Sequence, residues 1–250
     1  MQHRWKYLLD RGVLMIGAAL LSAPTALQAD NERLTQLAER VHAQDQPGQE
    51  GGHHGHANQH MNQASLEQLI ARFEDPKRDV WQKPNAVIAL LGDLQGKVVM
   101  DIGSGSGYFS FRLADAGARV ICADVDERFL AYIAEQIDAR QIEPDRMMLR
   151  HIPYDSAQLK AAEVDMVLIV NTYHHIEDRE GYFSEVRAGL KPGGQLVVVD
   201  FFKHATEIGP PEDMKLAAHV VIDELRSAGF SRFETDRDTL PYQYVIQAYP

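Results

Sequence analysis

The residues with the clearest chemical potential form a glycine-rich loop directly after a short apolar segment. The segment 98–102 is followed by Gly103, Ser104, Gly105 and Gly107. Glycines permit positive φ and let a bound molecule approach the backbone closely. The spacing therefore indicates either a ligand-binding loop at the end of a strand or a tight turn with a purely structural role.

Two residues beside this loop bear on the kind of ligand. Asp101 precedes the glycines, and a carboxylate there would repel a diphosphate but suit a cationic ligand such as an ammonium or a sulfonium. A dinucleotide-binding fingerprint requires a further glycine where Tyr108 stands. A nicotinamide-dependent oxidoreductase is therefore disfavoured.

Acidic residues also follow the next two expected strands. Asp124 lies 21 residues after Gly103, where an acidic side chain can accept hydrogen bonds from the hydroxyl groups of a ribose. The alternative for Asp124 is a cap on the helix that follows, although Asp126 is better placed for that role. Asp155 could accept a hydrogen bond from the amino group of an adenine or could cap a helix, and the two interpretations are equally favoured.

From residue 65 onward, short apolar segments alternate with helical patterns. Helices are expected over residues 65–73, 85–91, 109–116, 127–139, 182–190 and 211–228. Strands are expected over residues 97–102, 119–123, 147–152, 165–170, 195–200, 230–234 and 242–248. Apolar runs without alternation indicate strands buried on both faces. The pattern predicts an α/β fold with a doubly wound parallel sheet, which binds ligands at the carboxyl ends of its strands.

The composition excludes several classes for the chain as a whole. It has 250 residues, of which 45% are hydrophobic and 24% charged, so it is not disordered, collagen-like or a polytopic membrane protein. A net charge of -11 makes nucleic acid an unfavourable partner. Cys122 is the only cysteine, which rules out an internal disulfide and a cysteine-rich zinc site.

The first 29 residues have the pattern of a secretory signal peptide. Arg4, Lys6 and Arg11 precede a stretch without charge, whose apolar centre at 13–21 is short for a membrane-spanning helix. Cleavage is expected after Ala29. We therefore expect an exported, periplasmic protein with no stable membrane span after cleavage; an uncleaved anchor and an ordinary N-terminal helix are the alternatives.

Residues 30–64 are polar and are expected to form a histidine-rich flexible linker. Four histidines lie close together among glycines: His53, His54, His56 and His60. Imidazoles at this density bind divalent metals weakly, but without acidic or thiolate ligands at fixed spacing they do not form a preorganised site. A simple spacer is the alternative.

The motifs together resemble those of class I S-adenosylmethionine-dependent methyltransferases. After the glycine loop and Asp124, the segments 164–176 and 190–201 are similar to those of small-molecule methyltransferases related to ubiquinone and menaquinone biosynthesis. The resemblance covers about residues 80–250. It implies a Rossmann-like, mostly parallel seven-stranded sheet with helices on both faces and an antiparallel last strand over 242–248.

The resemblance also assigns roles in binding S-adenosylmethionine. Asp101 and the loop 103–107, including Ser104, would hold the methionine part of the cofactor. Asp124 would bind the ribose, with Val125 beside the adenine. These assignments are specific for the cofactor and say little about the methyl acceptor.

Further residues are assigned in the same way at the ends of the third and fourth strands. Asp155 would reach the adenine amine, and Asn171 would face the methionine and the methyl group. The expected reaction is an in-line transfer to an unidentified small molecule, which needs a base only if the acceptor must lose a proton. His174 or His175 could be that base; packing and a hydrogen bond to the backbone are the alternatives.

Two questions remain open at this point. The segment 81–85 could form part of a lid over the cofactor or could anchor the N-terminal helix. Export also conflicts with a cofactor that is made in the cytosol, so a noncatalytic exported protein that binds a nucleoside, or a metal through its histidines, is the alternative to an enzyme.

Overall fold

The computed structural model describes residues 64–250 of the chain. The expected signal peptide, 1–29, and all but the last residue of the expected linker, 30–64, lie outside this region. The four clustered histidines lie outside it as well. Within residues 64–250, none of the helices is both long enough and apolar enough to cross a membrane.

Seven strands form one sheet in the order β3-β2-β1-β4-β5-β7-β6. Their bounds are β1 Val98–Ile102, β2 Arg119–Asp124, β3 Met147–His151, β4 Val164–Val170, β5 Leu190–Phe201, β6 Arg232–Asp236 and β7 Gln243–Tyr249. Strands β1 to β5 pair in parallel, whereas β7 runs antiparallel to both β5 and β6. The predicted Rossmann-like sheet with its antiparallel last strand is confirmed.

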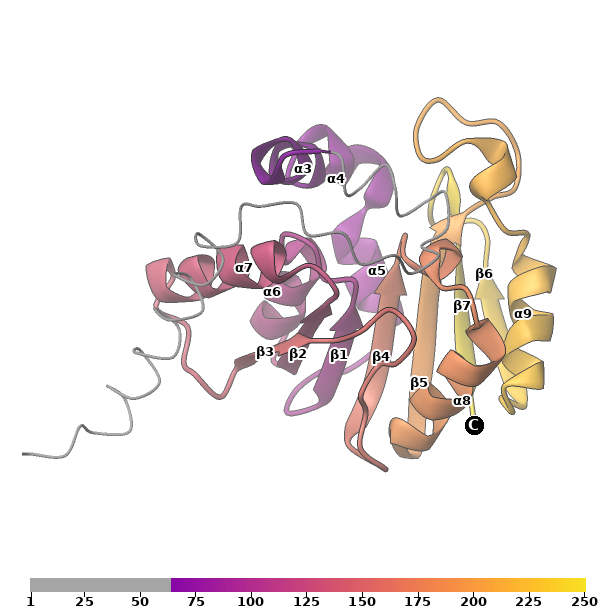
Figure 1. Ribbon diagram of the computed structural model, residues 1–250. Helices are drawn as coiled ribbons and strands as arrows, with labels where there is room; N and C mark the ends of the chain where they lie inside the picture. Colours follow the sequence, from indigo (N-terminus) through magenta and orange to yellow (C-terminus); the bar gives the residue numbers. More distant parts are fainter. Residues whose placement is uncertain (1–63) are drawn as a thin grey trace, which may run out of the picture.

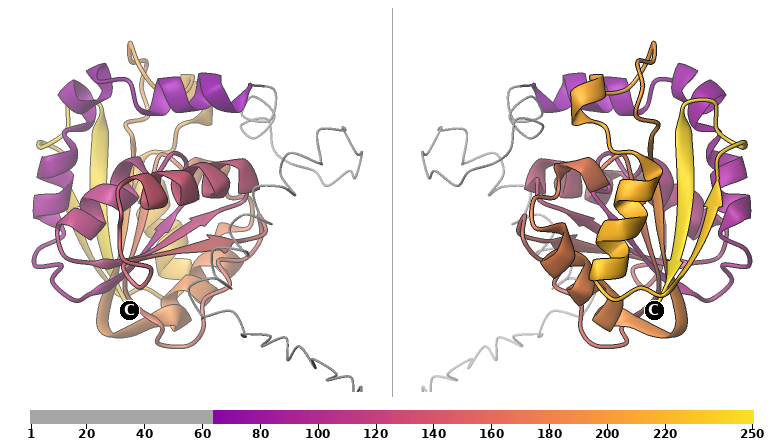
Figure 2. Two further views of the ribbon diagram at one scale, coloured as in Figure 1. Left: turned by 90° about the vertical axis from the view of Figure 1, so that its left-hand side faces the viewer. Right: turned by 90° about the vertical axis from the view of Figure 1, so that its right-hand side faces the viewer.

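Helices cover both faces of this sheet (Figures 1 and 2). Their bounds are α3 Leu66–Phe73, α4 Lys77–Gln82, α5 Pro84–Leu90, α6 Tyr108–Asp115, α7 Glu127–Ala139, α8 Arg179–Gly189 and α9 Ala218–Ser227. Short 3-10 turns, η1 Tyr173–His175 and η2 Glu212–Met214, follow β4 and precede α9. One apolar layer joins the sheet to α5, α6 and α7, and a second joins it to α8 and α9.

The helix expected over residues 211–228 is wrong in its first half. The chain makes only η2 there, passes through extended residues and begins α9 at Ala218. The cause is Lys215, whose side chain is buried and whose ammonium group donates to the carbonyl of His204. A lysine is buried only when its charge is hydrogen-bonded, and this bond holds the segment against the loop after β5.

Helices α3 and α4 lie across the carboxyl edge of the sheet, where the parallel strands end (Figures 1 and 2). Ser65 caps α3 in a reciprocal capping box with Gln68. Trp81 in α4 packs against Phe201 at the end of β5, with ring centres 5.8 Å apart. Residue 81 is therefore an anchor for α4, and the helix pair it anchors covers the glycine loop.

Candidate active site

The glycine loop connects β1 to α6 and follows a path that side chains would block. Gly103 has φ +72°, and a Cβ atom there would lie 2.3 Å from Oγ1 of Thr172. Gly107 has φ +81° and precedes the first turn of α6. The hydroxyl groups of Ser104 and Ser106 are buried and have no hydrogen-bond partner in the described structure. The loop therefore presents unused donors at the strand ends.

Asp101 is the last residue but one of β1, Asp124 is the last residue of the neighbouring strand β2, and both side chains are buried. Asp101 accepts a hydrogen bond of 2.6 Å from the Ser110 hydroxyl. Asp124 accepts from the backbone N–H groups of Gly105 at 2.8 Å and of Asp126 at 3.0 Å. Burial raises the pKa of each carboxyl group to about 6. The site thus contains two carboxylates that lack a fully compensating charge.

The structure decides between the alternatives for the acidic residues that follow β2 and β3. Asp126 caps α7 by accepting from the N–H of Arg128 at 3.0 Å, so capping is not the role of Asp124. No helix begins between residues 152 and 163, so the capping alternative for Asp155 is wrong. Asp155 is exposed in a turn, and Val125 is half-buried.

Asn171, at the end of β4, belongs to a ring of three carboxamides. Its amide group donates to Gln82 at 3.2 Å, and Gln82 donates to Gln243 at 2.6 Å. Gln243 closes the ring by donating to the Asn171 oxygen. Asn171 has the left-handed φ of +58°, which brings its side chain to this junction. The ring ties α4, β4 and β7 together above the sheet.

The two histidines after β4 differ in environment. Nδ1 of His174 lies 3.0 and 3.1 Å from the two carboxylate oxygens of Asp200, and both side chains are buried. His175 is also largely buried, and desolvation lowers its pKa to about 4, so it is neutral at pH 7. The structure therefore distinguishes the two candidates, because His174 has the Asp200 carboxylate to orient its ring, whereas desolvation keeps His175 neutral.

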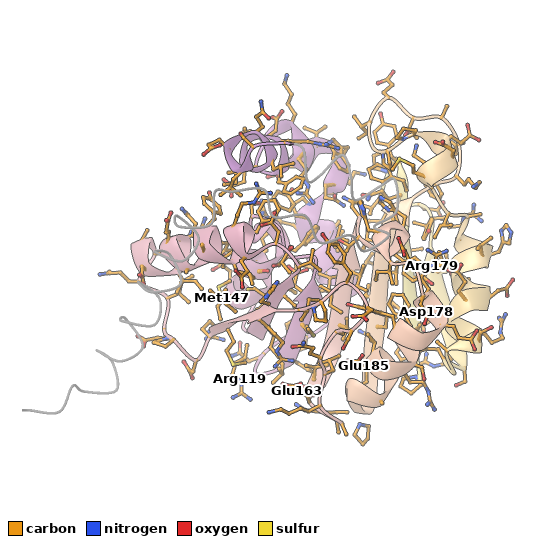
Figure 3. All side chains as sticks on the ribbon, viewed as in Figure 1. Arg119, Met147, Glu163, Asp178, Arg179 and Glu185 are labelled. Carbon is orange, nitrogen blue, oxygen red and sulfur yellow. The ribbon has the colours of Figure 1, made fainter. Side chains whose placement is uncertain are left out.

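The turn that carries these histidines is fixed from α8 and α9. Arg179, labelled at the start of α8 in Figure 3, donates to the carbonyl of Ile176 at 2.6 Å. Its guanidinium group also pairs with Glu224 of α9. The Tyr173 hydroxyl donates to the same carboxylate at 2.9 Å. This clamp holds the histidine pair at the carboxyl end of β4.

Comparison with known proteins decides what kind of domain carries this geometry. Residues 100–198 match the family model described as a methyltransferase domain. This segment contains the loop, Asp101, Asp124, Asn171 and the histidine pair. This segment therefore forms part of a class I methyltransferase domain. The cofactor of this class is S-adenosylmethionine.

Individual relatives agree with this assignment. Over 146 residues the chain is 29% identical to a probable S-adenosylmethionine-dependent methyltransferase from Mycolicibacterium smegmatis, covering 56% of this chain and 54% of the relative. It is 31% identical to a ubiquinone biosynthesis O-methyltransferase from Acinetobacter baumannii, covering 42% of this chain and 44% of the relative. The chain thus spans about half the length of these curated relatives.

Solved structures support the fold. A S-adenosylmethionine-dependent methyltransferase from Aquifex aeolicus superposes with a TM-score of 0.66 at 21% identity, covering 74% of this chain and 98% of that one. A putative type 11 methyltransferase from Sulfolobus solfataricus gives 0.56 at 21% identity, covering 66% and 90%.

The site also contains a buried cation that the sequence does not reveal. Arg78 of α4 donates to the carbonyl of Phe73 at 3.0 Å, while its Nε atom has no partner in the described structure. Its guanidinium carbon lies 3.9 Å from the ring centre of Tyr108. Burial lowers the Arg78 pKa to about 10, so it remains charged at pH 7 beside the Asp101 carboxylate. An Arg in an otherwise unremarkable polar segment gives no sequence signal for this position.

The expected metal-binding histidines, His53, His54, His56 and His60, lie outside the described residues, so their role stays a prediction. Within residues 64–250, no group of three or more histidine, cysteine or acidic side chains is arranged to hold a metal ion. Cys122 is buried in β2, and desolvation raises its pKa to about 12, so its thiol is not a nucleophile at pH 7.

Proposed function

We propose that this chain binds S-adenosylmethionine and methylates a small-molecule acceptor. The observation that carries this proposal is the pair of buried carboxylates, Asp101 and Asp124, on either side of a glycine loop with unpartnered Ser104 and Ser106 hydroxyls. Buried charges of one sign are retained when a ligand supplies the opposite charge or the missing hydrogen-bond donors.

The residues fit the cofactor group by group. Asp101 would accept a hydrogen bond from the methionine ammonium of the cofactor. Arg78 is the nearby cation that would pair with the methionine carboxylate. Asp124, at the end of β2, is placed to accept the ribose hydroxyls. When bound, the cofactor supplies a methyl group activated by its sulfonium. Asn171 supports the methionine end from the carboxamide ring.

Two further side chains complete the cofactor contacts that we propose. Val125 directly follows Asp124 at the end of β2, and its half-buried side chain packs at the edge of the apolar layer, where it can cover the adenine. Asp155 is exposed in the turn after β3, the strand beside β2, and its carboxylate is free to accept the adenine amine.

His174 is the residue that we propose as the base. A proton on Nδ1 donates to Asp200, which leaves the lone pair of Nε2 free to accept a proton. Nε2 would take up the proton that the acceptor loses on methylation, and the cofactor would supply the methyl group and leave as a neutral thioether. Asp200 is a positioning residue in this proposal, because it orients the ring without touching the acceptor.

Calorimetric titration of the full chain with S-adenosylhomocysteine tests the cofactor site. We expect micromolar binding, and Asp124→Asn is expected to weaken it at least about tenfold because it removes a charged acceptor. Asp138→Asn, which removes an exposed carboxylate from α7, is the control and should bind normally. A folded wild-type protein that does not bind would refute the proposal.

Turnover separates an enzyme from the noncatalytic alternative. The protein is incubated with methyl-labelled S-adenosylmethionine and a library of small nucleophiles, and labelled products are counted. Transfer that is reduced in His174→Gln, with unchanged affinity for S-adenosylhomocysteine, is the expected result. Tight binding with no transfer to any nucleophile would favour the binding protein.

We also propose that the protein is exported and loses residues 1–29. The support is the charged start and apolar centre of this segment. Cell fractionation with N-terminal sequencing of the periplasmic material should give a chain that begins at Asp30. Recovery of the uncut chain from the cytoplasm would contradict this.

A further inference from the structure

A groove at the carboxyl edge of the sheet is left unexplained by the cofactor contacts. It has a volume of about 550 Å³, within the range of small-molecule sites. It lies between the loop after β5, the start of α9 and the loop between β6 and β7. The side chains that matter for its chemistry are Phe202, Lys203, His204, His219, Arg237 and Asp238.

The charge of this groove is opposite to that of the chain. The whole chain carries a net charge of -11, yet Lys203 and Arg237 face the groove against a single acid, Asp238. Within residues 64–250, neither cation forms an ion pair with a carboxylate. Two unpaired cations on one concave surface attract an anion.

The groove is held in shape by the segment that replaces the first half of the expected helix. Lys203 donates to the carbonyl of Lys215 at 3.0 Å, and Lys215 donates to the carbonyl of His204 at 2.9 Å. The Phe202 ring stacks on His204, and the Arg237 guanidinium lies 5.6 Å from the centre of the Phe202 ring. The Arg237 cation is thus held beside an aromatic surface.

The position of the groove relates it to the transfer chemistry. Phe202 lies two residues beyond Asp200, which is about 7 Å along an extended chain. Asp200 in turn holds His174. The groove therefore adjoins the strand end that carries the Asp200–His174 pair.

We propose that this groove binds an anionic group, a carboxylate or a phosphate, of the methyl acceptor. The acceptor is then a small aromatic or apolar molecule with a negative charge at one end and a nucleophile at the other. This inference rests on the proposed methyltransferase function for its meaning, but the groove can be tested by binding alone.

The test is a titration of the full chain with benzoate and with phenyl phosphate, and with benzamide as a neutral probe of similar shape. Each titration is done with and without saturating S-adenosylhomocysteine, whose own binding is measured first. Loss of S-adenosylhomocysteine binding reports on the cofactor site, whereas the anion titrations report on the groove. The tighter of the two anions identifies the preferred group.

Three variants make the test specific. The double variant Lys203→Gln/Arg237→Gln is expected to weaken anion binding at least about tenfold. Asp238→Asn is expected to strengthen it about two- to fivefold, a gain that misfolding cannot produce. Arg119→Gln removes one positive charge from the start of β2, at the opposite edge of the sheet (Figure 3), and should change nothing.

Two results would overturn the proposal. One is benzamide binding as tightly as benzoate, since charge would then play no part. The other is anion binding that is absent, or that the double variant leaves unchanged, in a protein that still binds S-adenosylhomocysteine. The second result would leave the cofactor site intact and remove only the anionic acceptor.

Discussion

At the scale of single residues, Asp101 and Asp124 reduce the stability of the protein without its cofactor. Burial raises the pKa of each to about 6, well above the value near 3.9 of an exposed aspartate. An acid whose pKa rises on folding binds its proton more tightly in the folded state. Folding stability from these groups therefore increases as the pH falls from about 6 to about 4, and is lower and constant above 6.

Asp101→Asn is expected to stabilise the protein without its cofactor. At pH 7 the free energy of unfolding should rise by about 1–3 kcal/mol, because a buried charge is removed while the Ser110 hydroxyl keeps an acceptor. Urea denaturation at pH 7 and pH 4.5 measures this. The gain should shrink at pH 4.5, where the wild-type carboxyl is already protonated; an equal gain at both values would contradict the assignment.

The affinity for S-adenosylhomocysteine should depend on pH with the opposite sign. In the proposed site the ionised forms of Asp101 and Asp124 bind the ligand, so affinity should be constant above about pH 7 and fall as the pH drops through 6. Calorimetry between pH 5 and pH 8 gives the profile. Asp124→Asn should flatten it as well as lower it, and a profile that rises toward acid would refute the roles of both carboxylates.

The sequence allowed prediction of some site residues and not of others. Asp101 and Asp124 stand at fixed distances from the glycines, so their positions at neighbouring strand ends follow from the alternation of strand and helix. Gln82, Asp200 and Gln243 carry no such signal. Each is a single polar residue at the end of an element, and their contacts join elements far apart in the chain.

At the scale of elements, the glycine loop requires space as well as backbone freedom. Gly103→Ala and Gly193→Ala form a matched pair, because both glycines have φ between +70° and +80° but only Gly103 faces a neighbour, Thr172. Gly193→Ala should cost about 1 kcal/mol from backbone strain. Gly103→Ala should cost about 1–3 kcal/mol more from the clash. Thermal denaturation of both variants checks this, and equal costs would show that Thr172 moves freely.

The carboxamide ring should control how firmly α4 is held. Gln243→Leu leaves buried polar groups of Gln82 and Asn171 without partners, which should cost about 1–3 kcal/mol. Hydrogen exchange in residues 77–82 should become faster than in the wild type. Gln136→Leu on α7, a half-buried glutamine, serves as the control. Unchanged exchange in α4 would mean that its other contacts, those of Trp81 and Asp79, suffice to anchor the helix.

The helices also show where patterns in the sequence are reliable. Helix α7 begins and ends as expected, because its apolar residues repeat at the helical period and Asp126 caps it. Helix α4 was missed because Val80 is 77% exposed, so the segment has no apolar face to recognise. The break before α9 was missed because it depends on the burial of Lys215, which the local sequence does not indicate.

At the scale of the whole molecule, β7 completes the sheet. Its residues Tyr244, Val245 and Ile246 are buried and pair with β5, the last of the parallel strands. Deletion of residues 230–250 should therefore abolish cooperative thermal unfolding, measured by circular dichroism. Deletion of residues 1–63 should preserve it, since the sequence predicts no packing there. Loss of cooperativity in the second deletion would contradict the proposed domain boundary at residue 65.

The arrangement also gives the molecule a built-in optical reporter. The chain has two tryptophans, Trp5 and Trp81. Replacing Trp5 by phenylalanine leaves Trp81 of α4 as the only tryptophan. Its indole ring lies against Phe201 at the end of β5, and the next residue, Phe202, lines the groove. Its emission wavelength would report any movement of α4 in real time, so stopped-flow fluorescence could follow the order in which the two ligands arrive.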